Sequence, residues 1–310
     1  MHVPDGFINA PVSAVAGLIS ISSIWTATKA ANRFLADKLI AIAGMMSALI
    51  FVLQMINFPI AAGTSGHLLG GTLAVIVLGP SLGILCVSIV VILQALLFAD
   101  GGLSALGINI LNIAIITGLI GWLVISNWKK IFGDNSSSII IGSFIAGMIS
   151  VIMSSIAFVI EYFFGGTVSV DIGSVFFAMV SSHFFIGIGE GIITALIVSL
   201  LLRVRPDMLY ISREKEPRSS FFSILGLLVL IIFSAVLITP LASSSPDGLE
   251  DVASRFDFES QNNILILLDG YLIPGVNNNF VSVILSGILG IIVVGLIMNI
   301  YLNVNRKKSI

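Results

Sequence analysis

Residues 82–98, LGILCVSIVVILQALLF, decide the fold class, because no charged residue interrupts this apolar run. A helix of about 20 mainly apolar residues crosses the hydrocarbon core of a membrane. Comparable runs recur along the chain, which is 57% hydrophobic and only 10% charged, whereas soluble domains carry about 25% charged residues. The sequence therefore predicts an all-α fold, a polytopic membrane helical bundle.

Apolar segments of this kind predict nine membrane spans. The third segment is short, and we expect Pro80 to break it from the fourth, because proline cannot continue a helix without losing a hydrogen bond. The expected spans are residues 8–28, 36–58, 66–79, 82–98, 106–126, 138–160, 177–202, 220–239 and 280–302.

Basic residues gather in a few groups between these spans. Cytoplasmic loops of membrane proteins carry an excess of Lys and Arg. Counting nine spans places every group on the same side, so we expect a multi-pass protein of the cell membrane with its N-terminus outside and its C-terminus in the cytoplasm. The groups are Lys29, Arg33 and Lys38; Lys129 and Lys130; Arg203, Arg205, Arg213, Lys215 and Arg218; and Arg306, Lys307 and Lys308.

A polar stretch at 203–220, RVRPDMLYISREKEPRSS, is the best candidate for a domain boundary. It predicts a seven-span body at 1–206, a cytoplasmic linker at 207–219 and a two-span unit at 220–310. The outer loop of that last unit, about 241–279, is acidic and is expected to attract cations. The sequence contains no Walker A pattern or other nucleotide-binding loop, and nothing in it indicates a nucleic-acid partner.

The first residues, MHVPDG at 1–6, place a histidine directly after the α-amine. The α-amine, the His2 backbone nitrogen after loss of its proton, and the His2 imidazole can chelate a metal in one plane, leaving a fourth position open. Square-planar nitrogen ligation is typical of Ni(II) and Cu(II) sites. The alternative interpretation is a mobile initiator segment whose histidine binds nothing.

Two features favour a chelating N-terminus. No positively charged region precedes an apolar core as in a signal peptide, so we expect Met1 to be the mature first residue. Pro4 fixes its own φ angle, and Pro-Asp-Gly at 4–6 predicts a turn that holds the segment in place. Pro-Asp-Gly recurs at 246–248, where we interpret it as the same common turn.

A Gly-rich connection at 57–71, NFPIAAGTSGHLLGG, offers a fourth nitrogen. His67 lies where this connection enters the membrane, on the same outer face as Met1. Glycine permits close backbone approach, so a re-entrant loop can bring His67 beneath the inserted N-terminus. The alternative is a hydrogen-bonded core histidine.

A third candidate region, HFFIGIGEG at 183–191, places His183 and Glu190 on one face of a predicted helix. An ionisable residue inside a membrane span is a functional hypothesis by default. His183 and Glu190 are therefore candidates for an outer shell of the metal site or for an ion pathway. Asp5, in the N-terminal turn, is a third candidate. A packing role for Glu190, beside glycines that allow close helix contact, is the alternative.

Four blocks of the chain resemble the CbiM/NikM substrate-specificity subunits of energy-coupling-factor transporters for cobalt and nickel. With the spans between them they cover about the first 206 residues. The tail, with PDGLE at 246–250, resembles the small NikN-like partner, so the chain is similar to a fused NikMN arrangement. The blocks are MHVPDGF at 1–7, NFPIAAGTSGHLLGG at 57–71, QALLFADGGLSALGINILN at 94–112 and HFFIGIGEGIITA at 183–195.

The resemblance implies a seven-span substrate-specificity (S) component with metal held by Met1, His2 and His67. The ligands would be the Met1 amine, the amide and imidazole nitrogens of His2, and the His67 imidazole. It also implies partners, namely a membrane coupling (T) subunit and two cytoplasmic ABC-type ATPases. Proline and aspartate at 4–5 favour the nickel branch of the family.

We therefore expect a subunit that captures Ni(II), its transported substrate, for ATP-driven import, without organic cofactor or enzymatic activity of its own. Co(II), for cobalamin synthesis, is the alternative substrate. A proton-coupled secondary transporter with Glu190 and His183 as relay is a second class of hypothesis. An intramembrane metalloenzyme is a third, although the chain lacks His-Glu-x-x-His. Whether the C-terminal unit is needed for metal loading is left open by the sequence.

Overall fold

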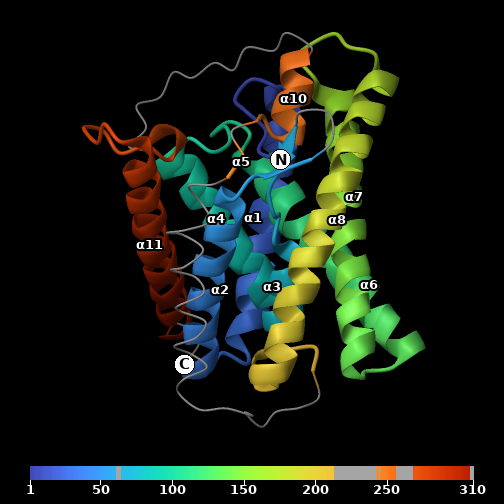
Figure 1. The fold of residues 1–310 in the computed structure, drawn as a ribbon, viewed down its shortest axis with the longest axis vertical. Helices are drawn as coiled ribbons and strands as arrows, with labels where there is room; N and C mark the ends of the chain where they lie inside the picture. The colour runs from blue at the N-terminus through green and yellow to red at the C-terminus, as the bar shows by residue number, and fades with distance from the viewer. Residues whose placement is uncertain (61–63, 213–241, 244, 256–267, 308–310) are drawn as a thin grey trace.

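The computed structural model describes residues 1–60, 64–212, 242–243, 245–255 and 268–307. Within these residues, long helices run side by side as a bundle (Figure 1). Seven helical segments in the described part of the chain are long and apolar enough to cross a membrane, which confirms the predicted all-α polytopic fold. They are α1 (Ala10–Asn32), α2 (Asp37–Met55), α4 (Pro80–Phe98), the composite segment Leu106–Phe132, α7 (Ser136–Gly165), α8 (Ile172–Val204) and α11 (Asn279–Lys307).

Three of the long helices begin at side-chain caps that the sequence supplies. Asn9, Asn135 and Asp171 precede α1, α7 and α8, and each accepts a hydrogen bond from the backbone N–H three residues on. Such caps satisfy N–H groups that have no partner inside the helix. Large apolar side chains are exposed on the outer surface of the bundle, for example Leu18 and Ile21 on α1. Such side chains are expected on helices that face lipid.

The composite segment Leu106–Phe132 changes its winding midway. It consists of α5 (Leu106–Asn109), a π-helical stretch η2 (Ile110–Ile116) and α6 (Thr117–Phe132). π-Helical turns inside longer helices are frequent at functional sites. Here the change in winding directly follows Asn109, which contacts the N-terminal segment described below.

The prediction of a helical span at 66–79 is wrong for residues 66–70, which are not helical. The chain enters through a short antiparallel pair, β1 (Phe58–Pro59) with β2 (Ser65–Gly66), and becomes helical only at α3 (Gly71–Leu78). Eight residues of helix rise about 12 Å, which is less than half of the hydrocarbon thickness of about 30 Å. α3 ends at Gly79 and α4 begins at Pro80, so the predicted break is confirmed.

The residues before α3 can remain non-helical because side chains of other helices form hydrogen bonds with their backbone groups. The Glu190 carboxylate on α8 accepts hydrogen bonds from Leu69 N (2.6 Å) and Gly70 N (3.0 Å). Gln54 Nε2 on α2 donates to the Leu69 carbonyl at 2.8 Å. Irregular backbone at membrane depth is tolerated only where protein groups replace water in this way. The extended segment that carries His67 is thus built into the bundle.

The C-terminal unit is described in part. The predicted span 220–239 lies outside the described residues, whereas the last span is α11, which packs mainly against α2. Two short helices of this unit, α10 (Gly248–Arg255) and η6 (Asp269–Tyr271), lie at the end of the bundle where the N-terminus is found (Figure 1).

Part of the predicted linker packs against the bundle instead of leaving it. After a short helical turn, η3 (Pro206–Met208), Tyr210 N donates to the Val77 carbonyl at 2.9 Å. Ile211 accepts a hydrogen bond from Lys129 Nζ on α6 at 2.6 Å. The domain boundaries drawn from the sequence remain a prediction.

Candidate metal centre

The N-terminus is buried among the helices. Met1 is 2% exposed, and Ser154 Oγ on α7 donates a hydrogen bond to its sulfur at 3.4 Å. Because the side chain occupies a position in the core, the α-amine is held inside the protein.

The block at 94–112 forms a cradle for this segment. The side-chain amide of Asn109 pairs with the backbone of Val3, accepting from its N–H (2.7 Å) and donating to its carbonyl (3.1 Å). Gly102 N donates to the same carbonyl at 2.9 Å. A Cβ on Gly102 would lie 2.3 Å from Asp5 N, so only glycine permits this approach.

His67 presents a lone pair to the α-amine. Its Nδ1 donates to the Leu68 carbonyl at 2.9 Å, which leaves Nε2 unprotonated in the neutral ring. The Met1 amine lies 2.8 Å from that Nε2. The rings of His2 and His67 stack with their centroids 5.2 Å apart. The structure therefore brings together the three residues that the sequence singled out as ligands.

The His2 ring is held by Asp100, which follows α4. His2 Nδ1 lies 2.9 Å from Asp100 Oδ1, while His2 Nε2 is buried without a hydrogen-bond partner among the described residues. Burial by itself would raise the pKa of Asp100, but the neighbouring His2 ring outweighs it and holds this pKa below its usual range. The carboxylate is therefore ionised and orients the imidazole.

Asp247, from the C-terminal unit, contacts the same amine. Its Oδ2 accepts from Met1 N at 2.7 Å and lies 3.6 Å from His67 Nε2. Asp247 is only 6% exposed. Burial acts to raise the pKa of this carboxyl, but the N-terminal ammonium holds it well below its usual range. A charged pair thus joins the C-terminal unit to the first residue of the chain.

The sequence Pro-Asp-Gly-Leu-Glu explains how Asp247 is held. Its Oδ1 accepts hydrogen bonds from Leu249 N and Glu250 N, at 2.7 and 2.8 Å, and so caps α10. In return, Glu250 Oε2 accepts from Asp247 N at 2.9 Å. This reciprocal arrangement is a capping box with aspartate at the cap. It leaves the second oxygen of Asp247 free to face the α-amine.

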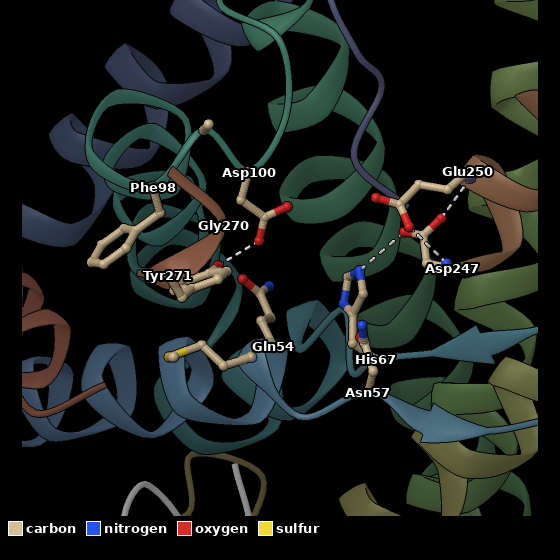
Figure 2. Close-up of a pocket in the computed structure, with 11 residues that line it drawn as sticks. Gln54, Asn57, His67, Phe98, Asp100, Asp247, Glu250, Gly270 and Tyr271 are labelled. Carbon is tan, nitrogen blue, oxygen red and sulfur yellow. Dashed lines mark hydrogen bonds and ion pairs between the residues drawn. The ribbon is translucent and has the colours of Figure 1, made fainter. Parts of the chain in front are cut away.

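A cavity of about 340 Å³ lies against His67, between the N-terminal body and the C-terminal unit. Figure 2 shows carboxylates arranged around it, with Gln54 and Tyr271 on the wall nearer α2. Among the described residues, no group of three or more His, Cys, Asp or Glu side chains could hold a metal ion. A metal site here would rely on main-chain nitrogen as well, which Met1 and His2 supply. Side chains that line the cavity include Gln54, His67, Asp100, Asp247, Glu250 and Tyr271.

The remaining candidates support this cluster at a distance. Glu190 holds the backbone just beyond His67, as described above. His183 faces the C-terminal unit, since a Cβ on Gly248 would lie 3.3 Å from its Cε1. Asp5 Oδ1 accepts from both the N–H and the hydroxyl of Ser104, each at 2.6 Å. Their roles in an outer shell or a pathway stay predictions.

Sequence reasoning did not select Asp100, Asp247 or Tyr271 as site residues. Asp100 lies inside a block quoted for its family resemblance, directly before Gly101, which marks a close approach. Asp247 lies in the second Pro-Asp-Gly, at 246–248, which the sequence analysis interpreted as a common turn. No local pattern marks Tyr271.

Comparisons with known proteins all find similarity to proteins of metal uptake or transport. The family model described as cobalt uptake substrate-specific transmembrane region (CbiM) matches residues 2–208. The chain is 33% identical to a putative fused nickel transport protein NikMN of Archaeoglobus fulgidus, with 95% of both chains covered. It is 37% identical to a putative metal transport protein of Haloquadratum walsbyi, covering 70% of this chain and 96% of that one. A crystal structure of a truncated transition metal transporter matches with a TM-score of 0.59 and 28% identity, covering 66% of this chain and 99% of that one.

Proposed function

Because the chain belongs to the CbiM family of cobalt uptake substrate-specific transmembrane regions, we propose that it captures Ni(II) as the substrate-binding subunit of a metal importer. The observation that carries this proposal is the buried meeting of Met1, His2 and His67, with the α-amine 2.8 Å from His67 Nε2. Similarity over nearly the whole chain to a protein named as a fused nickel transporter supports nickel. Co(II) is the second candidate, because the family is named for cobalt uptake.

The proposed ligands are four nitrogen atoms. The Met1 amine and the His2 amide bind after losing a proton, and the His2 imidazole closes the chelate. His67 Nε2 fills the fourth position, for which its unprotonated state suits it. Protons leave as the metal binds, so capture is linked to pH.

Loading requires the His2 ring to turn. Only Nδ1 can chelate together with the backbone nitrogen of the same residue, because Nε2 lies on the far side of the ring. In the structure Nδ1 faces Asp100 and Nε2 has no hydrogen-bond partner among the described residues. A half-turn about the Cβ–Cγ bond replaces the Nδ1–Cε1 edge of the ring by its Cδ2–Nε2 edge. It thus frees Nδ1 for the metal and brings Nε2 to the side of Asp100. A ligating histidine whose second nitrogen donates to a carboxylate is the usual outer-shell arrangement.

The nature of the ligands favours nickel over most rivals. Four nitrogens in a plane, one from an ionised amide, suit low-spin Ni(II) better than Co(II) or Zn(II). Cu(II) binds such ligands at least as well by the general affinity order, so copper must be excluded by its availability.

Energy for import would come from other chains. The sequence holds no nucleotide-binding loop, so we propose a membrane coupling subunit and two cytoplasmic ATPases as partners, as in energy-coupling-factor systems. The basic groups between the spans support an outside N-terminus and a cytoplasmic C-terminus. The metal would then enter from the outer end, where α10 and the N-terminus lie (Figure 1).

Paired histidine variants test the site. His67→Ala removes one proposed ligand and should weaken Ni(II) binding by at least the roughly 10–100-fold typical of outer-shell losses. His183→Ala, a histidine on α8 that faces Gly248, should have a smaller effect. Isothermal titration of both variants decides the matter, and equal small losses would remove His67 from the site.

Uptake into sealed liposomes tests the transport class. The chain alone should bind nickel without accumulating it, and the three partner chains should make radioactive nickel uptake depend on ATP. Concentrative uptake by this chain alone, driven by a proton gradient, would instead identify a secondary transporter.

A further inference from the structure

Tyr271, in the C-terminal unit, reaches the metal centre of the N-terminal body (Figure 2). Its hydroxyl donates to Asp100 Oδ2 at 2.5 Å and accepts from Gln94 Nε2 at 3.1 Å. Its ring stacks on Phe98 with centroids 4.8 Å apart and meets Phe51 edge-on at 6.2 Å. The ring is therefore held by α2 and α4, and the hydroxyl has a defined direction.

The backbone around Tyr271 is shaped to deliver this side chain. Gly270 and Tyr271 both have positive φ angles, 59° and 62°. A left-handed backbone is uncommon for a bulky residue and persists only where surrounding contacts determine it. Leu268 N donates to the Leu97 carbonyl at 3.0 Å, which fixes the turn on the end of α4.

We propose that Tyr271 is a positioning residue for metal capture, acting through Asp100 on the His2 imidazole. This inference rests on the proposed function. One oxygen of Asp100 faces His2 and the other accepts from Tyr271. The tyrosine therefore fixes the plane of the carboxylate, which would accept from Nε2 of His2 once the ring has turned as proposed above. The C-terminal unit is thereby part of the metal centre, because Asp247 contacts the amine and Tyr271 contacts the carboxylate that faces the imidazole.

The expected effect is moderate. The Asp100 side chain is 23% exposed, so water can replace the tyrosine hydroxyl but cannot hold the carboxylate in one plane. Outer-shell partners typically contribute about 10–100-fold to metal affinity, and Tyr271→Phe should fall at the lower end, about tenfold. The phenylalanine ring keeps the stacking on Phe98, so the variant removes the hydroxyl alone.

Nickel titration of the full chain with its native N-terminus provides the test. Tyr301→Phe is the matched control, because Tyr301 on α11 also joins the C-terminal unit to the body, pairing with Thr28 Oγ1 at 2.6 Å. Tyr271→Phe should weaken nickel binding, whereas Tyr301→Phe should leave it unchanged. Equal affinity of wild type and Tyr271→Phe would overturn the proposal.

A double-mutant cycle separates positioning from general support of the fold. If Tyr271 acts through Asp100, adding Tyr271→Phe to Asp100→Asn should cost little beyond Asp100→Asn alone, since coupled residues are not additive. Fully additive losses would contradict the proposed route.

The ¹⁵N chemical shifts of the His2 ring in metal-free protein give a readout independent of nickel. They should change in Tyr271→Phe and not in Tyr301→Phe. Wild-type protein that fails to bind nickel would sink the proposed function, while these shifts still decide whether Tyr271 orients His2.

Discussion

The same tripeptide, Pro-Asp-Gly, occurs at 4–6 and at 246–248, and the aspartates of the two copies have different partners. In the first, Asp5 bonds the neutral backbone and hydroxyl of Ser104 near solvent, and Gly6 turns the chain with φ of 80°. In the second, Asp247 is buried, caps α10 and faces the Met1 ammonium. The first copy positions the N-terminal segment, and the second contacts the α-amine at its end.

The difference comes from burial and from the partner. A solvent-accessible carboxylate that bonds neutral donors can exchange them for water at small cost. A buried carboxylate paired with a cation leaves an uncompensated charge when its partner is removed. The shared tripeptide therefore predicts a turn in both places, whereas the capping box with Glu250 and the long-range contact with residue 1 distinguish Asp247.

The largest expected effect comes from moving the amine. One additional residue before Met1 would shift the charged nitrogen away from both Asp247 and His67, and the 2% exposure of Met1 leaves no room for it. Nickel affinity should fall by more than about 100-fold, beyond the usual outer-shell range. A C-terminal tag is the control and should be harmless. Stoichiometric nickel in an extended, folded protein would contradict the role given to the amine.

Acid should weaken nickel binding nearly as much. Each proton released on binding makes affinity fall about tenfold per pH unit, and the amide releases one at every pH between about 6 and 8. The pKa values of Asp100 and Asp247 lie below the usual range, so both carboxylates stay ionised in this window. Their contribution to stability is lost only as pH falls through those lowered values. Titrations at several pH values measure the slope, and a flat profile would exclude an amide ligand.

The two aspartates give the direct comparison. Asp247→Asn removes the charge beside the amine and should weaken nickel binding by about tenfold, as for other outer-shell partners. Asp5→Asn should change it by about twofold or less, the usual range for surface substitutions. Competition with a chelator of known affinity measures both, and equal losses would remove the distinction drawn between the two tripeptides.

The smallest expected change concerns the support beneath His67. Glu190→Gln leaves one of the two N–H groups, at Leu69 or Gly70, without a good acceptor. A buried donor left unpaired costs about 1–3 kcal/mol, so thermal unfolding should report a clear loss of stability. Nickel affinity should fall less than in Asp247→Asn. A greater loss of affinity than in that variant would indicate that Glu190 contacts the metal or its path.

Much of the fold follows from the apolar runs, because a membrane requires helices of sufficient length. The segment at 66–79 could not be predicted in this way. Glu190, more than a hundred positions away in sequence, accepts a hydrogen bond from the backbone of this segment. Apolar composition does not predict that contact.

In the candidate site, too, some residues could be predicted from the sequence and others could not. Met1 and His2 are adjacent in sequence, and glycines around His67 indicated a re-entrant loop, so their meeting could be anticipated. Their role as ligands remains a prediction. Asp247 and Tyr271 reach the site only through the packing of the C-terminal unit against the body, and local spacing cannot reveal such contacts.

X-ray absorption at the nickel K-edge, on purified nickel-loaded protein with its native N-terminus, tests the central claim most directly. Four nitrogen ligands in a plane predict the pre-edge signature of square-planar Ni(II), together with a yellow, diamagnetic sample. A six-coordinate, paramagnetic nickel spectrum with oxygen ligands would contradict the four-nitrogen site.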